Sequence, residues 1–372
     1  MSDFDFYPHA VVWEITFACN MRCIHCGTSA GKKRPDELST QEALNLIDEL
    51  ADLRAYMIVL SGGEPLLRDD WRQLAERIGR RGIKPCLITN GYAITKGVVD
   101  DFERLGMSKI GVSFDGTEKT HNYIRQRDDS FRRAYSAMEM MSKNGNVKYA
   151  AVTQISNINL GELDEIRQHL LDVGCRQWRI QMTTCTGRMA ENSNLVLSLE
   201  NYPKLIDKCI EFKKDGRMDI DIGENIGFYG HKGYKLWNER PYYGCYAGMR
   251  VLGVESNGDI KGCLSMPETF VEGNIRDRSL SEIWNDPDSF AYNRKFTRES
   301  ADGDCHDCKY LPLCRGGCTV TSYSATGCRA NNPYCIYQME RREGVPERED
   351  TEEVTARLEL FREAMADVYE KT

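Results

Sequence analysis

Residues 11–26 read VVWEITFACNMRCIHC, an apolar run that leads directly into three cysteines. The β-branched and aromatic side chains of this run favour a strand. The cysteine triplet that follows, Cys19, Cys23 and Cys26, has the spacing C-x3-C-x2-C. Three thiolates this close can hold three corners of an iron–sulfur cube and leave the fourth iron open to a small molecule. The alternative is a structural zinc site with His25 as fourth ligand, although the second cysteine hook usual in zinc knuckles is missing nearby.

The composition is that of an ordinary globular protein with an unusual number of cysteines. The chain has 372 residues, 41% of them hydrophobic, 15 of them cysteine, and a net charge of −8. The negative charge argues against nucleic acid and against an anionic membrane surface as partners. The N-terminus has no signal-peptide pattern and no apolar run reaches membrane-spanning length. We therefore expect a cytoplasmic protein whose clustered cysteines bind metal rather than form disulfides.

Strand-like and helix-like patterns alternate from residue 11 to about residue 215. The expected strands are Val11–Ala18, Met57–Leu60, Pro85–Thr89, Ile110–Phe114, Val147–Ile155 and Trp178–Met182. Helical periods lie between them, the first opened by a capping box at Ser39 and Glu42. Six such units predict an α/β fold with a parallel sheet, either a partial (β/α)6 barrel or a doubly wound open sheet. In both, ligands bind at the carboxyl ends of the strands, where the cysteine triplet lies.

The alternating rhythm stops after about residue 215. A hairpin is expected from Val251 to Cys263 around the turn at Asn257–Gly258, and residues 300–340 are loop-like and dense in cysteine. Residues 350–370 are predicted to form a charged helix with one apolar stripe, made of Val354, Leu358, Phe361, Met365 and Val368. We expect three parts: 1–222 as the barrel, 223–345 as a cysteine-rich domain, and 346–372 as a C-terminal amphipathic helix.

The second expected strand ends in Ser61-Gly62-Gly63-Glu64-Pro65. The glycines let backbone groups approach a ligand closely, and Glu64 adds a negative acceptor suited to the ammonium group of an amino acid. Alone, such a triplet usually marks a turn.

Together with the cysteine triplet, this motif resembles the radical S-adenosylmethionine (SAM) superfamily. The resemblance implies a [4Fe–4S] cluster on Cys19, Cys23 and Cys26 whose open iron chelates SAM. It also implies that SAM is cleaved reductively to a 5′-deoxyadenosyl radical, which abstracts a hydrogen atom from a substrate. The residues implied to contact SAM are Gly62, Gly63, Glu64, Asn90, Ser113, Asp115 and Arg125. His25 stands where many relatives have an aromatic residue near adenine.

Seven later cysteines resemble the SPASM extension of this superfamily, which typically holds two auxiliary [4Fe–4S] clusters. The resemblance assigns Cys245, Cys263 and Cys318 to one cluster, here named group A. It assigns Cys305, Cys308, Cys314 and Cys335 to the other, here named group B. Three clusters are thus expected in all. A zinc ribbon is the alternative for Cys305, Cys308, Cys314 and Cys318.

Group A lacks the extra cysteine that some relatives carry shortly after Cys245. The fourth iron of this cluster is then open, or it binds an exogenous group, or it is held by a cysteine from elsewhere such as Cys328. Cys185 follows the sixth expected strand, and two readings stand for it: a hydrogen-atom donor to a substrate radical, or a small packed side chain.

The resemblance implies an enzyme, with a ribosomally made peptide undergoing oxidative modification as the leading substrate. The alternative substrate is a small molecule or cofactor precursor. Two other classes of protein remain, a zinc-stabilised binding protein and a pure electron carrier, and neither would cleave SAM. Sulfatase maturation is disfavoured because Leu264 stands where those relatives have Asp. Only 18 residues precede Cys19, so peptide maturation would call for a separate leader-binding protein. Reduced flavodoxin or ferredoxin is the expected electron donor.

Overall fold

The structure is a computed structural model, and it describes residues 6–359. The strands are β1 (Ala10–Thr16), β2 (Met57–Gly62), β3 (Lys84–Thr89), β4 (Lys109–Ser113), β5 (Tyr149–Ile155), β6 (Gln177–Met182), β7 (Asp219–Ile222), β8 (Val251–Val254), β9 (Asp259–Lys261) and β10 (Val271–Asn274). The helices are α1 (Thr40–Asp52), α2 (Trp71–Arg80), α3 (Lys96–Arg104), α4 (Glu118–Arg125), α5 (Ser130–Asn144), α6 (Leu163–Asp172), α7 (Arg188–Glu191), α8 (Tyr202–Asp215), α9 (Gly230–Leu236), α10 (Leu280–Asn285), α11 (Ala291–Arg294), α12 (Leu311–Cys314), α13 (Thr319–Thr326) and α14 (Ile336–Arg342).

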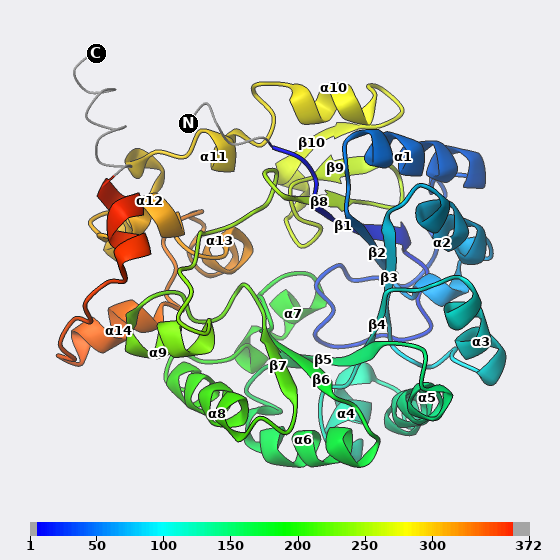
Figure 1. Cartoon of the computed structure of the whole chain (residues 1–372), viewed down its shortest axis with the longest axis horizontal. Coiled ribbons are helices and arrows are strands. Elements are labelled where there is room, and N and C mark those ends of the chain that lie inside the picture. Colours follow the sequence, from blue (N-terminus) through cyan, green and yellow to red (C-terminus); the bar gives the residue numbers. More distant parts are fainter. Residues whose placement is uncertain (1–5, 360–372) are drawn as a thin grey trace.

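Strands β1 to β7 are parallel neighbours in chain order and form an arc with helices on its outer side (Figure 1). This confirms the expected α/β architecture of a partial barrel. All six expected strands are present, with ends that differ by one or two residues. β7 is an additional strand that the sequence analysis did not predict. Its four residues, Asp-Ile-Asp-Ile, are too few to give a clear periodic signal.

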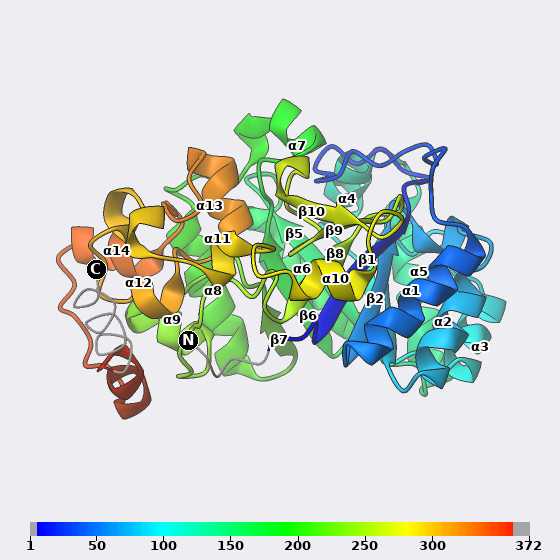
Figure 2. The same cartoon turned by 90° about the horizontal axis from the view of Figure 1, so that it is seen from above.

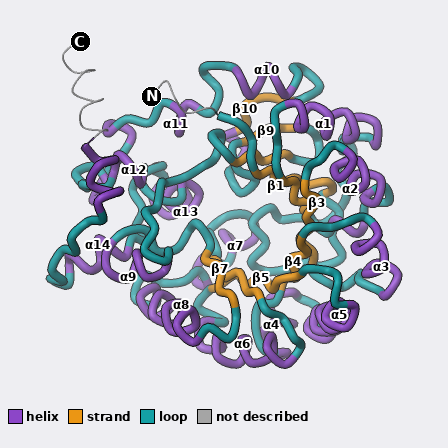
Figure 3. Tube along the Cα trace, in the orientation of Figure 1, coloured by secondary structure: helices purple, strands orange, loops and turns teal. Residues whose placement is uncertain are grey.

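The cysteine-rich region joins this sheet. β8 pairs in parallel with β1 on the side opposite β2, with Ala10 aligned to Val251. β9 and β10 extend the sheet as antiparallel strands, so its order is β10-β9-β8-β1-β2-β3-β4-β5-β6-β7. Figure 3 shows these three strands beyond the β1 end of the arc. The hairpin expected from Val251 to Cys263 is confirmed, and it is an extension of the barrel sheet rather than a separate layer.

The helices bury the faces that the sequence indicates. α1 begins with the capping box of Ser39 and Glu42, and it packs Ala43, Leu46, Ile47 and Leu50 into the main core. A second core, smaller and rich in tyrosine and cysteine, lies in the region of α9, α12 and α14, on the side away from α1 to α3 (Figure 2). The main core thus supports the barrel sheet and its helices, and the second core supports the cysteine-rich region.

Residues 352–359 are helical, and Val354 and Leu358 are buried against the second core. This favours packing of the C-terminal helix onto its own chain. The other members of the expected stripe, Phe361, Met365 and Val368, lie outside the described residues. Between residues 6 and 359, no helix has the length and hydropathy needed to cross a membrane.

Candidate iron–sulfur and SAM site

The cysteine triplet lies on a closed loop directly after β1. The backbone N–H of Cys19 donates to the Gly31 carbonyl at 2.8 Å, and the Gly31 N–H donates to the Phe17 carbonyl at 3.0 Å. Ala18 and Gly31 form a parallel bridge, so both ends of the loop are tied together. The loop begins here because β1 ends at Thr16, where the last carbonyls of the strand accept hydrogen bonds from neighbouring segments. Burial raises the pKa of Cys19 to about 11.

The triplet opens into a cavity of about 620 Å³ inside the arc of strands. Most of the residues expected to contact the cluster or SAM line it: Cys19, Cys23, Cys26, Gly62, Gly63, Asn90, Ser113 and Arg125. Cys263 of group A lines the same cavity, from the opposite part of the chain. A volume of this size is within the usual range for small-molecule sites. The structure therefore brings the triplet, the strand ends and one auxiliary cysteine to a single space.

Many inward-facing side chains of the strands are small. Ser61, Cys86, Gly111, Ser113 and Ala150 all line the cavity. The interior of a closed (β/α) barrel is normally filled by Val, Ile and Leu. Because small residues occupy these positions, the cavity reaches from the triplet at the carboxyl ends of the strands down to Lys109 at the start of β4.

Gly62 and Gly63 are required by the close approach of the chain at the ends of β1 and β2. A Cβ at Gly63 would lie 2.2 Å from the Ala18 carbonyl oxygen, and one at Gly62 would lie 2.3 Å from that of Thr16. Gly62 also has φ +143°, a conformation that favours glycine. The N–H groups of Gly63 and Glu64 donate to the carbonyls of Thr16 and Ala18, both at 2.8 Å. The glycines thus hold the triplet loop close to the second strand end, in addition to lining the cavity.

Glu64 is fully buried and is not among the residues that line the cavity. Its carboxylate accepts hydrogen bonds from the Asn90 N–H at 2.8 Å and from the Thr89 hydroxyl at 2.7 Å. Burial raises the pKa of Glu64 to about 7, because these bonds offset only part of the desolvation of the charge. Asn90 continues outward and donates to the side chain of Asn20, on the triplet loop, at 2.8 Å. Glu64 therefore lies behind the cavity wall and orders the strand ends there.

Asp115 is also fully buried and behind the wall, at the end of β4. Arg125 donates through Nε to Asp115 at 2.7 Å, and His25 Nε2 lies 3.3 Å from the same carboxylate oxygen. The adjacent positive charge of Arg125 holds the pKa of Asp115 well below its usual range, despite the burial. Arg125 itself reaches the cavity and contacts Cys23. His25, offered above as a zinc ligand or an adenine neighbour, thus lines the cavity with its Nε2 directed at Asp115.

A brace on the triplet loop was missed by the sequence analysis. Arg188, after β6, donates from Nε to the Cys23 carbonyl at 2.8 Å and from Nη1 to the Ala30 carbonyl at 3.0 Å. Its backbone N–H donates to the Cys26 carbonyl at 2.9 Å. A Cβ at the preceding Gly187 would lie 2.5 Å from that same carbonyl oxygen. The only sequence signal was a Gly-Arg pair at a strand end, which is not distinctive.

Cys185 is half-buried in this segment, and it does not line the cavity, although Thr184 and Thr186 on either side of it do. Its thiol lies near the ring of Tyr334, whose pKa is raised by burial and to a smaller extent by this thiol. A role as hydrogen-atom donor would need its side chain to turn toward the cavity.

The three thiols of group A come together from distant parts of the chain. Burial, together with the neighbouring thiols of Cys245 and Cys318, raises the pKa of Cys263 to about 12. Ser265 donates a hydrogen bond to the Cys263 thiol, and the Asn293 amide donates to the Cys245 carbonyl at 3.3 Å. Buried thiols at such spacing give up their protons readily only to a bound metal, so their arrangement fits a metal cluster.

Group B assembles in the same way inside the second core. Burial raises the pKa of Cys314 well above its ordinary value, and Cys335, Cys308 and Cys305 contribute in that order. Tyr242 lies between the two groups, since its pKa is raised by burial and then by Cys318, Cys245 and Cys314. The interleaved assignment of the seven cysteines agrees with this proximity.

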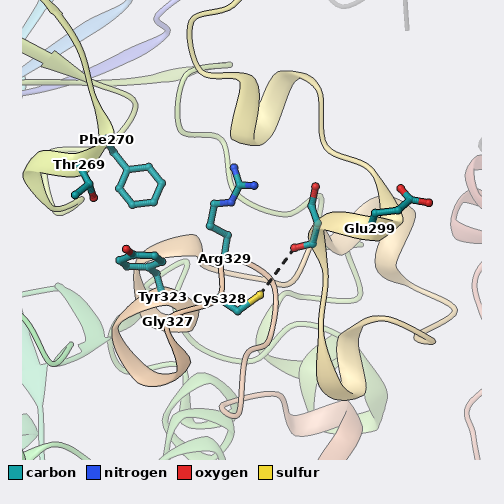
Figure 4. Close-up of a pocket in the computed structure, with 8 residues that line it drawn as sticks. Thr269, Phe270, Glu299, Tyr323, Gly327, Cys328 and Arg329 are labelled. Atoms are coloured by element: carbon teal, nitrogen blue, oxygen red, sulfur yellow. Dashed lines mark hydrogen bonds between the residues drawn. The ribbon is translucent and has the colours of Figure 1, made fainter.

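Cys328 lies beside group B. Its charge affects the Cys305 thiol, and its own Sγ is 3.9 Å from the Ser300 carbonyl oxygen, at a surface pocket with Tyr323 and Arg329 (Figure 4). This position argues against Cys328 as the fourth ligand of group A. Across residues 6–359, no three Cys, His, Asp or Glu side chains converge closely enough in this structure to share one metal ion.

Two family models match the chain. Residues 13–173 match the radical SAM superfamily, and residues 245–309 match the SPASM iron–sulfur cluster-binding domain. These segments contain the triplet and the first cysteines of groups A and B.

Similar proteins span nearly the whole chain. The AdoMet-dependent heme synthase of Methanosarcina barkeri is 29% identical over 351 residues, which are 89% of this chain and 97% of that protein. The mycofactocin maturase MftC of Mycolicibacterium smegmatis is 28% identical over 319 residues, 85% of this chain and 79% of that one. In fold, the chain resembles anSMEcpe with bound AdoMet and a Cp18Cys peptide, with a TM-score of 0.68, 20% identity, and coverage of 90% of this chain and 95% of that one. It also resembles Streptococcus suis SuiB bound to the precursor peptide SuiA, with a TM-score of 0.71, 16% identity, and coverage of 89% and 76%. The chain therefore belongs to the radical SAM superfamily and carries a SPASM domain, as the cysteine triplet and the seven later cysteines indicate.

Proposed function

We propose that this radical SAM/SPASM enzyme binds a [4Fe–4S] cluster on Cys19, Cys23 and Cys26 and two auxiliary clusters on groups A and B. The residues present fit this assignment, because ten thiols lie in three buried or half-buried sets and the triplet faces a cavity. Bound there and given one electron by an external reductant, the cluster and SAM would supply a 5′-deoxyadenosyl radical able to take a hydrogen atom from the substrate. Gly62, Gly63, Asn90, Ser113 and Arg125 form the wall against which SAM would lie. Glu64 and Asp115 hold that wall from behind.

We infer that the substrate is an anionic small molecule, such as a carboxylate-bearing cofactor precursor. The carrying observation is the charge of the cavity lining: its charged side chains are Lys109, Arg125, Arg179 and Arg188, and no Asp or Glu is among the lining residues of the described chain. Arg125 is paired with the buried Asp115, and Arg179 is paired with Asp221 and Glu224, which are partly exposed. Arg188 binds carbonyls, and Lys109 forms no ion pair with any residue described. A basic lining attracts the anionic groups of a ligand.

The relatives support this choice of substrate class. The heme synthase similarity covers 97% of that protein, and a Fe-coproporphyrin III synthase from Methanosarcina barkeri is 28% identical over 353 residues. Porphyrins of this kind carry several carboxylates. We therefore place an iron porphyrin first among the anionic candidates.

Peptide maturation is the second candidate, favoured by the 28% identity to MftC. Under this alternative the cavity would receive one side chain of a peptide that otherwise lies outside it.

The test uses the anaerobically reconstituted enzyme with SAM and dithionite. We expect Fe-coproporphyrin III to increase 5′-deoxyadenosine formation above the background without substrate and to change mass in parallel. The precursor peptide SuiA and the Cp18Cys peptide form the matched arm. Stimulation by a peptide and not by the porphyrin would overturn the small-molecule assignment. No 5′-deoxyadenosine under any condition would overturn the radical SAM activity itself.

A further inference from the structure

Arg125 connects a buried carboxylate to one cysteine of the triplet. Its Nη1 donates a hydrogen bond to Cys23 Sγ at 3.8 Å, while its Nε donates to Asp115 Oδ2 at 2.7 Å and its Nη2 donates to the same oxygen. The side chain of Arg125 is 10% exposed and that of Asp115 is fully buried. The guanidinium is thus held by its fork on one side and faces sulfur on the other.

Asp115 is itself held on every side. The Gln154 N–H donates to its Oδ1 at 2.9 Å, and its own N–H donates to Nδ1 of His121 at 3.0 Å. Its carbonyl accepts from the Asn159 side chain at 2.8 Å. A two-bond Arg–carboxylate pair fixes orientation as well as distance. Because Asp115 cannot move without breaking these bonds, the position of Arg125 against the sulfur is preorganised.

The three cysteines of the triplet differ in this respect. The Cys26 thiol lies 3.7 Å from the Thr28 hydroxyl, a neutral group, and the Cys19 thiol accepts a backbone hydrogen bond from Met21. Within residues 6–359, Cys23 is the member of the triplet that receives a hydrogen bond from a cationic side chain. A fixed cation and donor at one ligand sulfur stabilises additional negative charge on a cluster.

We propose that Arg125, positioned by Asp115, raises the reduction potential of the iron–sulfur cluster held by Cys19, Cys23 and Cys26. In the step concerned, one electron from an external reductant converts the cluster from the 2+ to the 1+ state, with no proton or bond transferred. The charge of Arg125 and its N–H stabilise the extra electron. This inference rests on the cluster-binding part of the proposed function and is independent of the substrate.

The test is an EPR-monitored redox titration of the holoenzyme with dithionite and mediators, without SAM or substrate. The signal of this cluster is isolated by subtracting spectra of a variant in which Cys19, Cys23 and Cys26 are all replaced by Ala. We expect Arg125→Met to lower the ratio of reduced to oxidised cluster at a fixed potential about tenfold, which corresponds to about 59 mV for one electron. Arg125→Lys, which keeps the charge and loses the fork, should lie between Arg125→Met and the unmodified enzyme.

Arg127→Met is the matched control. Arg127 donates to the Asn20 carbonyl on the same loop at 3.2 Å and contacts no sulfur of the triplet, so its replacement should leave the potential unchanged. If Arg125→Met loses its cluster, Arg125→Gln is titrated in its place and should shift in the same direction. An unchanged potential in a cluster-loaded Arg125 variant overturns the proposal. Failure of the unmodified protein to assemble this cluster would instead refute the proposed function.

Discussion

Replacing Arg188 with alanine should loosen the triplet loop without unfolding the protein. The change removes two hydrogen bonds from a charged donor, to the carbonyls of Cys23 and Ala30. It keeps the backbone bond from residue 188 to the Cys26 carbonyl. Hydrogen bonds to charged groups contribute about 1.5–3 kcal/mol each when well buried. Because Arg188 is half-buried, water will replace part of them, and we take about 1.5–3 kcal/mol for the pair.

This loss predicts a larger open fraction of the loop. At about 1.4 kcal/mol per factor of ten, the open population should rise about 10- to 100-fold. The assay is the rate at which an anaerobic chelator removes iron from the cluster of the triplet, followed by its EPR signal. Thermal unfolding should change little, because the bonds concerned lie in one loop. Arg188→Lys, which can satisfy one carbonyl and not both, should give an intermediate rate.

Arg132→Ala serves as the control, since Arg132 is 73% exposed and forms a surface ion pair with Glu118. Its iron loss should match that of the unmodified enzyme. If Arg188→Ala releases iron within twofold of the unmodified rate, the brace is not what retains the cluster.

Three further predictions concern the rest of the site. Cys263→Ala should lower the iron content by about four atoms per chain. Cys209 is a fully buried core thiol, so Cys209→Ala should keep the iron content of the unmodified protein. Equal iron in the two variants would contradict the assignment of group A. Burial raises the pKa of Glu64 to about 7 from an ordinary 4.5, so the folded state binds this proton more tightly and stability falls as the pH rises from 4.5 through 7. In denaturant unfolding of the apoprotein, the free energy of unfolding should therefore fall less with rising pH in Glu64→Gln than in the unmodified protein. An equal pH dependence in the two proteins would refute this. Lys109→Met should raise the KM for an anionic substrate about tenfold and leave substrate-free SAM cleavage unchanged; equal effects on both would place Lys109 outside substrate binding.

Local patterns in the sequence were sufficient for the main elements of the fold. The β-branched runs and the capping box of Ser39 and Glu42 predicted six strands and α1 correctly, because both signals come from neighbouring residues. The pairing of β8 with β1 was not predicted, since it joins segments separated by most of the chain. No periodicity within either segment encodes which strand it meets.

In the candidate site, too, features with a local sequence signal were predicted, and features that depend on distant segments were not. Cysteine spacing located the triplet, whereas the division of the seven later cysteines into groups A and B came from the resemblance to the SPASM extension. Glu64 was expected to face the ligand, and the structure places it behind the wall. Its environment depends on the Asn90 N–H and the Thr89 hydroxyl, which another strand supplies. Arg188 escaped notice for a related reason: its partners are carbonyl groups, which leave no trace in the sequence.

The pairing of β8 with β1 has a consequence for how the chain can be divided. Without β8, β1 would be the outer strand of the parallel sheet and would present unpaired N–H and C=O groups from Ala10 to Trp13. Exposed strands of this kind recruit other chains. A fragment ending at Ile222, after β7, should therefore self-associate. Its triplet loop would follow a strand that is paired on one side instead of two. The cysteine-rich region therefore supplies the strand that covers this edge of the barrel sheet, and a barrel separated from it would need a replacement strand at β1.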